Sequence, residues 1–283
     1  ALSIILILSI LFKNNLSLFC GCILLLTACL PKATVKVSNQ EYISKGKETH
    51  LPVASELMEG VQKQLVSVFA DSNLRPLFLS DFTNLILSSK SPTKTFENIA
   101  LQLKENPKAF PLIPELLFDF EMKSSFDQHS FLVKIEMPAT LPKDPSLMLV
   151  LDNYYSYPNP FENLPCIKVY FPSRPNMNYQ LISQRDYKEL MASLKKLVPS
   201  LEKAPLFLVG WKQSTQGALS LANQFPRDFS GVAVSGMTNQ LNYKNLDTVP
   251  IICFSSISSL EEQQWMHAFI ERLKARGNNK CLL

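Results

Sequence analysis

One stretch, residues 205–236, constrains the fold of this chain more than any other. Its sequence, PLFLVGWKQSTQGALSLANQFPRDFSGVAVSG, holds an apolar run, a short polar break, a helical segment and a second apolar run. Four of the eight glycines in the 283-residue chain fall here, namely Gly210, Gly217, Gly231 and Gly236. The pattern predicts a buried strand, a tight turn, a helix and a second buried strand.

The second half of the chain repeats this alternation of strands and helices. Residues 129–137 alternate between apolar and polar side chains, which indicates a half-buried strand, whereas residues 147–151 are continuously apolar, as in a strand buried on both faces. We expect further strands at 167–171, 206–209, 231–234 and 249–254, and helices at 187–197, 216–224 and 260–276. Such an alternation predicts an α/β fold with a mainly parallel sheet and helices on both faces.

Two segments resemble a known family. FLVKIEMPATLPKDPSLMLVLDN, residues 131–153, is similar to the opening strands of α/β-hydrolases, and GALSLANQFPRDFSGVAVSG, residues 217–236, is similar to their elbow helix and following strand. Residues 126–283 as a whole resemble the esterase branch of this superfamily, with its polyhydroxybutyrate-depolymerase-like and prolyl-peptidase-like members. The resemblance implies an α/β-hydrolase-like sheet flanked by helices, and serine-type hydrolysis of ester or peptide bonds.

The expected position of the nucleophile holds a lysine. In this superfamily the nucleophile lies on a sharp turn between small residues two positions away on either side. Here Gly210 and Ser214 are the small residues and Lys212 lies between them. A lysine cannot supply the hydroxyl that is acylated, although a strongly desolvated amine can act as a nucleophile. Ser214 is the nearest hydroxyl, but an elbow centred on it would place Lys212 and Gln216 at the crowded positions.

The oxyanion loop and the catalytic acid are altered as well. Residues 152–155, Asp-Asn-Tyr-Tyr, stand where the family usually has His-Gly, and residues 255–259 hold no carboxylate where the family usually has an aspartate. Glu261 suits the first turn of the last helix, where it stabilises the helix dipole. Asp247 precedes its strand and would therefore lie at the wrong end of the sheet for catalysis.

A catalytic histidine is missing from its expected place. His267 falls inside the last predicted helix, and His129 opens a strand that precedes the core. In the family the histidine follows one more strand, and residues 278–283 resemble only the beginning of that strand. The resemblance therefore implies a C-terminally truncated hydrolase-like domain with no catalytic residue.

Composition argues against several other functions. The net charge of +4 is small and dispersed, and the sequence has no Lys/Arg-rich run, no zinc-like Cys/His spacing and no phosphate-cradling glycine loop. We therefore expect no nucleic acid, metal or cofactor. Cys166 and Cys253 fall in apolar strand segments and read as buried free thiols, although an exported protein could oxidise such a pair.

The N-terminus has the pattern of an exported lipoprotein. Residues 1–28 form an apolar signal peptide with Lys13 as its positive charge, and Leu26-Thr27-Ala28-Cys29 resembles the bacterial lipobox. This pattern implies cleavage before Cys29 and acylation of its thiol, with residues 29–47 as a flexible tether. Because residues 1–30 are long enough to span a bilayer, a plain transmembrane anchor is the alternative.

Residues 48–124 read as a helical segment that precedes the α/β-hydrolase-like domain at 125–283. Apolar residues at helical spacing predict helices near 52–70 and 93–106, and residues 112–120 form a short apolar segment between prolines. His50 lies in the polar lead-in and reads as a solvated residue.

Together these observations favour an envelope lipoprotein with a non-catalytic α/β-hydrolase-like domain that binds or scaffolds. Its partners would be membrane lipid, through acylated Cys29, and an unidentified small-molecule or envelope ligand, on the exported side of the cell membrane or outer membrane. One alternative is a serine-type ester or peptide hydrolase that uses Ser214 or a truncated site. Another is a structural protein that makes its contacts through residues 48–124.

Overall fold

The computed structural model describes residues 55–70, 74–77, 86–87, 89–114, 116–151, 164–172, 182–212, 214–236, 243–254 and 260–283. The expected signal peptide, Cys29, the tether, His50 and the loops at 152–155 and 255–259 lie outside these residues. Among the helices of the described ranges, none has the length and apolarity needed to cross a membrane.

The described strands form one nine-stranded sheet in the order β1-β2-β3-β5-β4-β6-β7-β8-β9. Neighbouring strands are parallel from β5 to β9, whereas β1, β2 and β3 form an antiparallel extension that joins the sheet through β3 and β5. The mainly parallel sheet predicted from the sequence is therefore confirmed. The strands are β1 (Leu74–Pro76), β2 (Leu117–Lys123), β3 (Ser130–Glu136), β4 (Leu147–Leu151), β5 (Ile167–Tyr170), β6 (Leu206–Trp211), β7 (Gly231–Ser235), β8 (Ile251–Phe254) and β9 (Cys281–Leu282).

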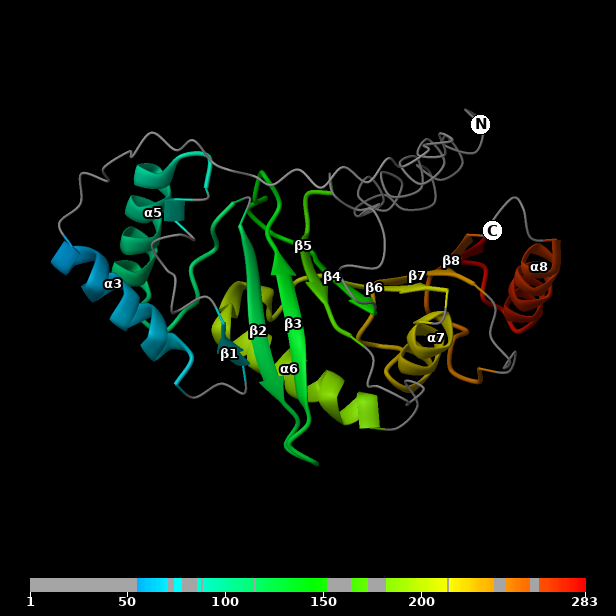
Figure 1. The fold of residues 1–283 in the computed structure, drawn as a ribbon. Coiled ribbons are helices and arrows are strands. Elements are labelled where there is room, and N and C mark those ends of the chain that lie inside the picture. Colours follow the sequence, from blue (N-terminus) through cyan, green and yellow to red (C-terminus); the bar gives the residue numbers. More distant parts are fainter. Residues whose placement is uncertain are drawn as a thin grey trace, which may run out of the picture.

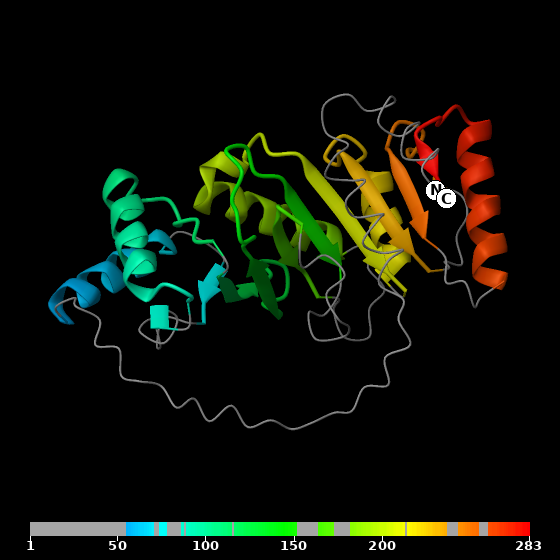
Figure 2. The same ribbon diagram turned by 90° about the horizontal axis from the view of Figure 1, so that it is seen from above.

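The described helices pack on one face of this sheet, with α3 and α5 at one end and α8 at the other (Figures 1 and 2). They are α3 (Ser55–Val68), α5 (Pro92–Glu105), α6 (Ile182–Leu197), α7 (Ser214–Gln224) and α8 (Leu260–Ala275), with a short 3₁₀ helix at Pro199–Leu201. Their buried residues share a core with Leu149, Leu208 and Val234, whereas Val150 and Val209 belong to a second cluster that includes no residue of a described helix. The sequence pattern predicted helices on both faces, whereas the described helices lie on one. The connections through α6, α7 and α8 all advance in one direction along the sheet. Because such crossovers are right-handed, they place these three helices on the same face.

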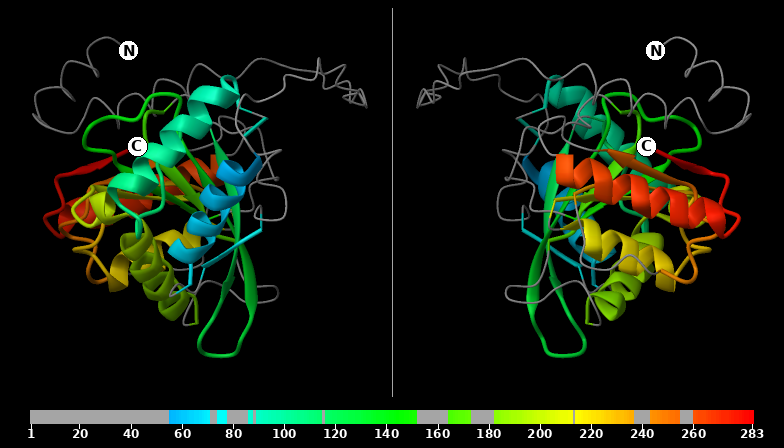
Figure 3. Two further views of the ribbon diagram at one scale, coloured as in Figure 1. Left: turned by 90° about the vertical axis from the view of Figure 1, so that its left-hand side faces the viewer. Right: turned by 90° about the vertical axis from the view of Figure 1, so that its right-hand side faces the viewer.

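Residues 117–123 form strand β2, whereas the sequence pattern predicted part of a helical segment there. Phe118 and Phe120 are buried and alternate with more exposed residues, as in a strand with one covered face. β2 pairs along its whole length with β3 in a projecting hairpin (Figure 3), so the expected domain boundary at 124/125 falls in the hairpin turn. The rings of Phe110 and Phe118 lie 4.8 Å apart, and the N-terminal helices share one core with the sheet.

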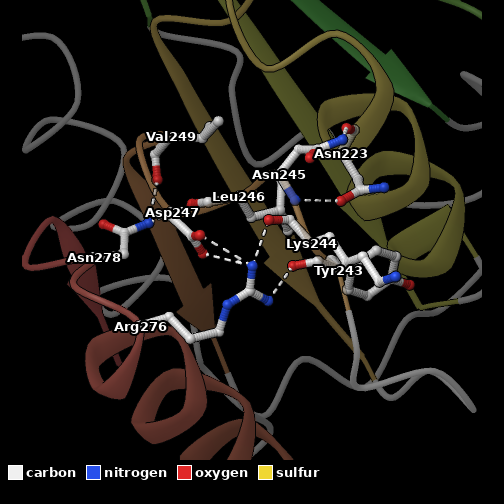
Figure 4. A network of polar contacts seen from close by, with 9 residues as sticks. All are labelled: Asn223, Tyr243, Lys244, Asn245, Leu246, Asp247, Val249, Arg276 and Asn278. Atoms are coloured by element: carbon white, nitrogen blue, oxygen red, sulfur yellow. Dashed lines mark hydrogen bonds and ion pairs between the residues drawn. The ribbon is translucent and has the colours of Figure 1, made fainter.

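Residues 243–249, which lead into β8, are tied to the C-terminal end of α8 (Figure 4). The Arg276 guanidinium donates to the carbonyl of Tyr243 at 2.6 Å and to the Asp247 carboxylate at 3.0 Å. The buried Asn278 amide holds the same segment through two further backbone carbonyls. Asp247 is thus fixed in an ion pair before the amino end of β8, on the side of the sheet opposite to the strand ends where α/β enzymes bind ligands.

Replacing Asn278 by alanine should lower the free energy of unfolding by about 2–3 kcal/mol, because two buried carbonyls lose their donor. The Asn278 side chain is 1% exposed and donates to the carbonyls of Leu246 at 2.6 Å and Val249 at 2.8 Å. Urea unfolding measures the loss, with the exposed neighbour Asn279→Ala as the matched control. A loss for Asn278→Ala no larger than that of the control would show that this network does not stabilise the fold.

Candidate functional site

The turn between β6 and α7 has the geometry of a sharp strand-to-helix elbow. β6 ends at Trp211, α7 begins at Ser214, and Lys212 between them has a left-handed backbone with φ 49°. The Lys212 N–H donates to the carbonyl of Ser235 at 2.5 Å, and the Thr215 N–H donates back to the Lys212 carbonyl at 3.1 Å. The turn is thereby fixed against the end of β7.

Glycines make room for this elbow on both of its sides. A Cβ at Gly210 would lie 2.6 Å from Ala218 Cβ and 2.7 Å from the Ser214 carbonyl oxygen. A Cβ at Gly236, where φ is 131°, would lie 2.8 Å from Lys212 Cα. The crowding that a nucleophile elbow imposes on its neighbours is therefore present around Lys212.

The side chains of the two candidate residues differ in exposure. The Lys212 side chain is exposed at the carboxyl end of β6. Ser214 is 6% exposed and forms the first residue of α7 beneath the turn. Thr215, which no sequence motif singles out, is fully buried and donates a hydrogen bond from its hydroxyl to the Ser235 carbonyl at 2.8 Å. The elbow thus presents an amine at its tip, and the hydroxyl of Thr215 is engaged in holding the turn together.

Replacing Lys212 by glycine should raise the free energy of unfolding by about 0.5–1 kcal/mol. A left-handed backbone strains every residue with a Cβ, so glycine relieves this strain. The greater conformational entropy of glycine in the unfolded state offsets only part of that gain. Chemical denaturation measures the change. Lys203→Gly, an exposed lysine in the turn before β6, is the control and should lose stability. Equal losses in the two variants would contradict the left-handed turn.

The remaining sequence candidates are not brought to this elbow. Glu261 is exposed in the first turn of α8, as expected, and His267 is exposed on the same helix. His129 precedes β3, and its ring lies edge-on to Phe131 with centroids 4.8 Å apart. Within the described ranges, no group of three or more His, Cys, Asp or Glu side chains could hold a metal ion. None of these groups is therefore placed to act as an acid or a base beside Lys212 or Ser214.

The described cysteines are buried free thiols. Burial raises the pKa of the Cys166 thiol to about 12, with an opposing contribution from the nearby Lys168 ammonium. Burial also raises the pKa of Cys253, and it raises that of Cys281 to about 12. Thiols with such pKa values are almost fully protonated at neutral pH and are poor nucleophiles.

A cluster of buried charges lies between β3 and β5, where the sequence pattern predicted strands and no site. Lys168, which is fully buried, contacts the Glu136 carboxylate at 2.5 Å, and the Tyr170 hydroxyl donates to the other carboxylate oxygen at 2.8 Å. A surface hollow of about 210 Å³ lies at the start of α5, where Lys90, Lys94 and several hydroxyls line it. Neither feature is part of the elbow, because β4 separates the cluster from β6 and the hollow lies at the far end of the molecule (Figure 1).

No family model matches the sequence, and no curated protein sequence matches it either. Among solved structures, a thermostable esterase matches at 14% identity and a TM-score of 0.47, covering 59% of this chain and 54% of that one. The enterobactin esterase of Shigella flexneri matches at 15% and 0.48, covering 62% and 55%. The BES protein of Bacillus cereus matches at 12% and 0.48, covering 59% and 86%. The match thus spans only about half the length of the first two esterases.

These identities and TM-scores are too low for the likenesses to establish the fold or the function of this chain. The mainly parallel sheet and the elbow after β6 are the features that the sequence resemblance implied. The described chain therefore has an α/β-hydrolase-like fold.

Proposed function

We propose that this chain is a lipid-anchored protein of the bacterial cell envelope whose hydrolase-type domain binds or scaffolds without catalysing hydrolysis. One observation carries the proposal: the elbow keeps its left-handed turn and its supporting glycines, but the residue at its tip is Lys212. Acyl transfer at such an elbow needs a hydroxyl or thiol nucleophile with a base beside it. Loss of a triad residue lowers turnover by several orders of magnitude.

Neither alternative nucleophile gains support from its surroundings. A lysine becomes a useful nucleophile when burial or a second cation lowers its pKa, whereas the Lys212 side chain is exposed. Ser214 is buried beneath the turn, and no described histidine lies at the elbow to take its proton.

Ester turnover tests this proposal. The purified chain, incubated with p-nitrophenyl acetate and butyrate, should release p-nitrophenol no faster than a Ser214→Ala variant with the same unfolding midpoint. Saturable turnover that disappears in Ser214→Ala would favour the serine-type hydrolase instead.

The envelope location rests on the lipobox-like residues 26–29 and on the apolar run before them. Two or more acyl chains on Cys29 would hold the protein at the membrane, since each buried methylene contributes about 0.8 kcal/mol. The partners we propose are membrane lipid and an envelope or small-molecule ligand. The net charge of +4 is dispersed along a sequence with no Lys/Arg-rich run, so nucleic acid is not among the partners that we propose.

Cys29→Ala should abolish acylation and move the protein from the membrane to the soluble fraction. Expression in a bacterial host with a radiolabelled or alkyne-tagged fatty acid, followed by fractionation, measures both effects. Cys22→Ala, which lies within the expected signal peptide, is the matched control and should leave labelling unchanged. Membrane retention of the unlabelled Cys29→Ala variant would instead indicate a transmembrane anchor.

A further inference from the structure

The surface hollow of about 210 Å³ at the start of α5 lies far from the elbow and has no part in it (Figure 1). Six residues between Ser89 and Asn98 line this hollow together with Ile113 and Pro114. It therefore lies where two segments that are separate in the sequence come together. Its volume is large enough for several water molecules or for one small anion.

The Gln102 side chain fixes these two segments to each other. Its amide donates to the Leu112 carbonyl and accepts from the Leu112 N–H, both at 2.8 Å. The same amide donates to Asn98 Oδ1 at 2.9 Å. Because this bond engages the oxygen of the Asn98 amide, the nitrogen with its two N–H groups is what Asn98 has left to offer in the lining of the hollow.

The hollow is lined by cationic and neutral hydrogen-bond donors. Lys90 and Lys94 are exposed and contribute ammonium groups, and none of the described residues that line the hollow is acidic. Ser91 is the N-cap of α5, but its side chain makes no capping hydrogen bond. Its hydroxyl is therefore not engaged by the helix that it begins, and the Thr95 hydroxyl lies in the same lining.

This set of donors suits a tetrahedral oxyanion. A phosphate group carries negative charge and presents oxygens in several directions, so an ammonium, hydroxyls and an amide can donate to it at the same time. A carboxylate has only two oxygens, which lie in one plane, and leaves some of these donors unused. A neutral ligand gains nothing from the cation.

We infer that this hollow is a binding site for a phosphate group, with Lys94 as its cation and with Ser91, Thr95 and Asn98 as hydrogen-bond donors. A free phosphate and the phosphodiester of a lipid headgroup share this chemistry. The Gln64 side chain of α3 donates to the Leu103 carbonyl of α5 at 3.0 Å, so the hollow lies beside the helix that follows the expected lipidated tether in the sequence. A lipid as the source rests on the proposed envelope location, whereas the phosphate site itself depends neither on that location nor on the elbow.

Titration calorimetry of the purified chain at constant ionic strength tests the inference. The probes are inorganic phosphate and glycerophosphoglycerol, the soluble headgroup of phosphatidylglycerol, with acetate as the comparison. At least one of the two phosphates should bind saturably, and acetate should not. Tighter binding of the phosphodiester would identify a lipid headgroup as the ligand, and tighter binding of inorganic phosphate would identify a free phosphate.

Two substitutions assign the binding to this hollow. Lys94→Met, which keeps much of the length of the side chain and removes its charge, should weaken phosphate binding about tenfold or more. Thr95→Val, which replaces the hydroxyl by a methyl group of similar size, should weaken it by a smaller factor. Lys104→Met is the matched control, because Lys104 is exposed in the last turn of the same helix, and it should leave binding unchanged.

The inference fails if neither phosphate binds saturably, if acetate binds as tightly, or if Lys94→Met and Lys104→Met weaken binding equally, which would indicate only a diffuse attraction to positive charge. None of these failures bears on ester turnover, so the non-catalytic proposal would stand. Ser214-dependent turnover would overturn that proposal whatever the phosphates do.

Discussion

Glu136→Leu should lower the free energy of unfolding by about 3–5 kcal/mol, the largest loss we expect from a single substitution, because it leaves a buried cation without its counter-charge. The Lys168 side chain is 0% exposed, and its Nζ lies 2.5 Å from a Glu136 carboxylate oxygen. The Tyr170 hydroxyl, which donates to the other oxygen at 2.8 Å, would lose its acceptor as well. Urea unfolding of the purified chain measures the loss.

A double-mutant cycle separates this electrostatic effect from a packing effect. Glu136→Leu combined with Lys168→Met removes both charges and should recover most of the lost stability. The exposed pair of Lys63 and Glu59 is the control, and Lys63→Met should cost less than about 1 kcal/mol. If the double variant were as unstable as Glu136→Leu alone, the cost would lie in side-chain shape rather than in the orphaned charge.

Gly210→Ala should cost about 2–3 kcal/mol, because the new methyl group has no space on the inner side of the elbow. It would lie 2.6 Å from Ala218 Cβ and 2.7 Å from the Ser214 carbonyl oxygen, and both neighbours belong to the regular part of α7. Relief therefore requires β6 and α7 to move apart.

Gly60→Ala is the matched control for this substitution. Gly60 lies inside α3 and has nothing within 4 Å of its added methyl group, so this variant should gain about 0.5–1 kcal/mol from helix propensity. Opposite signs for the two variants in the same denaturation assay are expected. A Gly210→Ala variant as stable as the parent would show that α7 does not pack against β6 at this distance.

The sequence predicted the centre of this fold well, because its strands are continuous apolar runs. β4 and β7 are buried at every position, which leaves no polar alternation that could suggest another structure. The elbow was predictable for a related reason: a left-handed turn packed under a helix requires small residues at fixed spacing, and Gly210 and Ser214 have that spacing around Lys212.

The antiparallel extension could not be predicted in the same way. β2 lies close after prolines, and its alternation of buried and more exposed residues indicates a strand only once β3 is seen to pair with it. The buried state of Lys168 was equally hidden. A lysine between apolar residues of a strand reads as exposed, and its partner Glu136 becomes its neighbour only because β3 and β5 pair antiparallel.

The burial of the Trp211 indole N–H is a feature next to the elbow in sequence that sequence alone could not reveal. A tryptophan at the end of a strand reads as apolar packing, and only the structure shows that its indole N–H is buried without an acceptor.

Active-site labelling tests the central claim most directly. The chain is incubated with a fluorophosphonate, which modifies nucleophilic serines of hydrolases, and its intact mass is measured beside an active serine esterase and a heat-denatured sample of the chain. The account predicts that the native chain keeps its unmodified mass while the esterase is fully labelled. Stoichiometric addition of one phosphonyl group, mapped to Ser214 and absent after denaturation, would show that the elbow is still a catalytic centre.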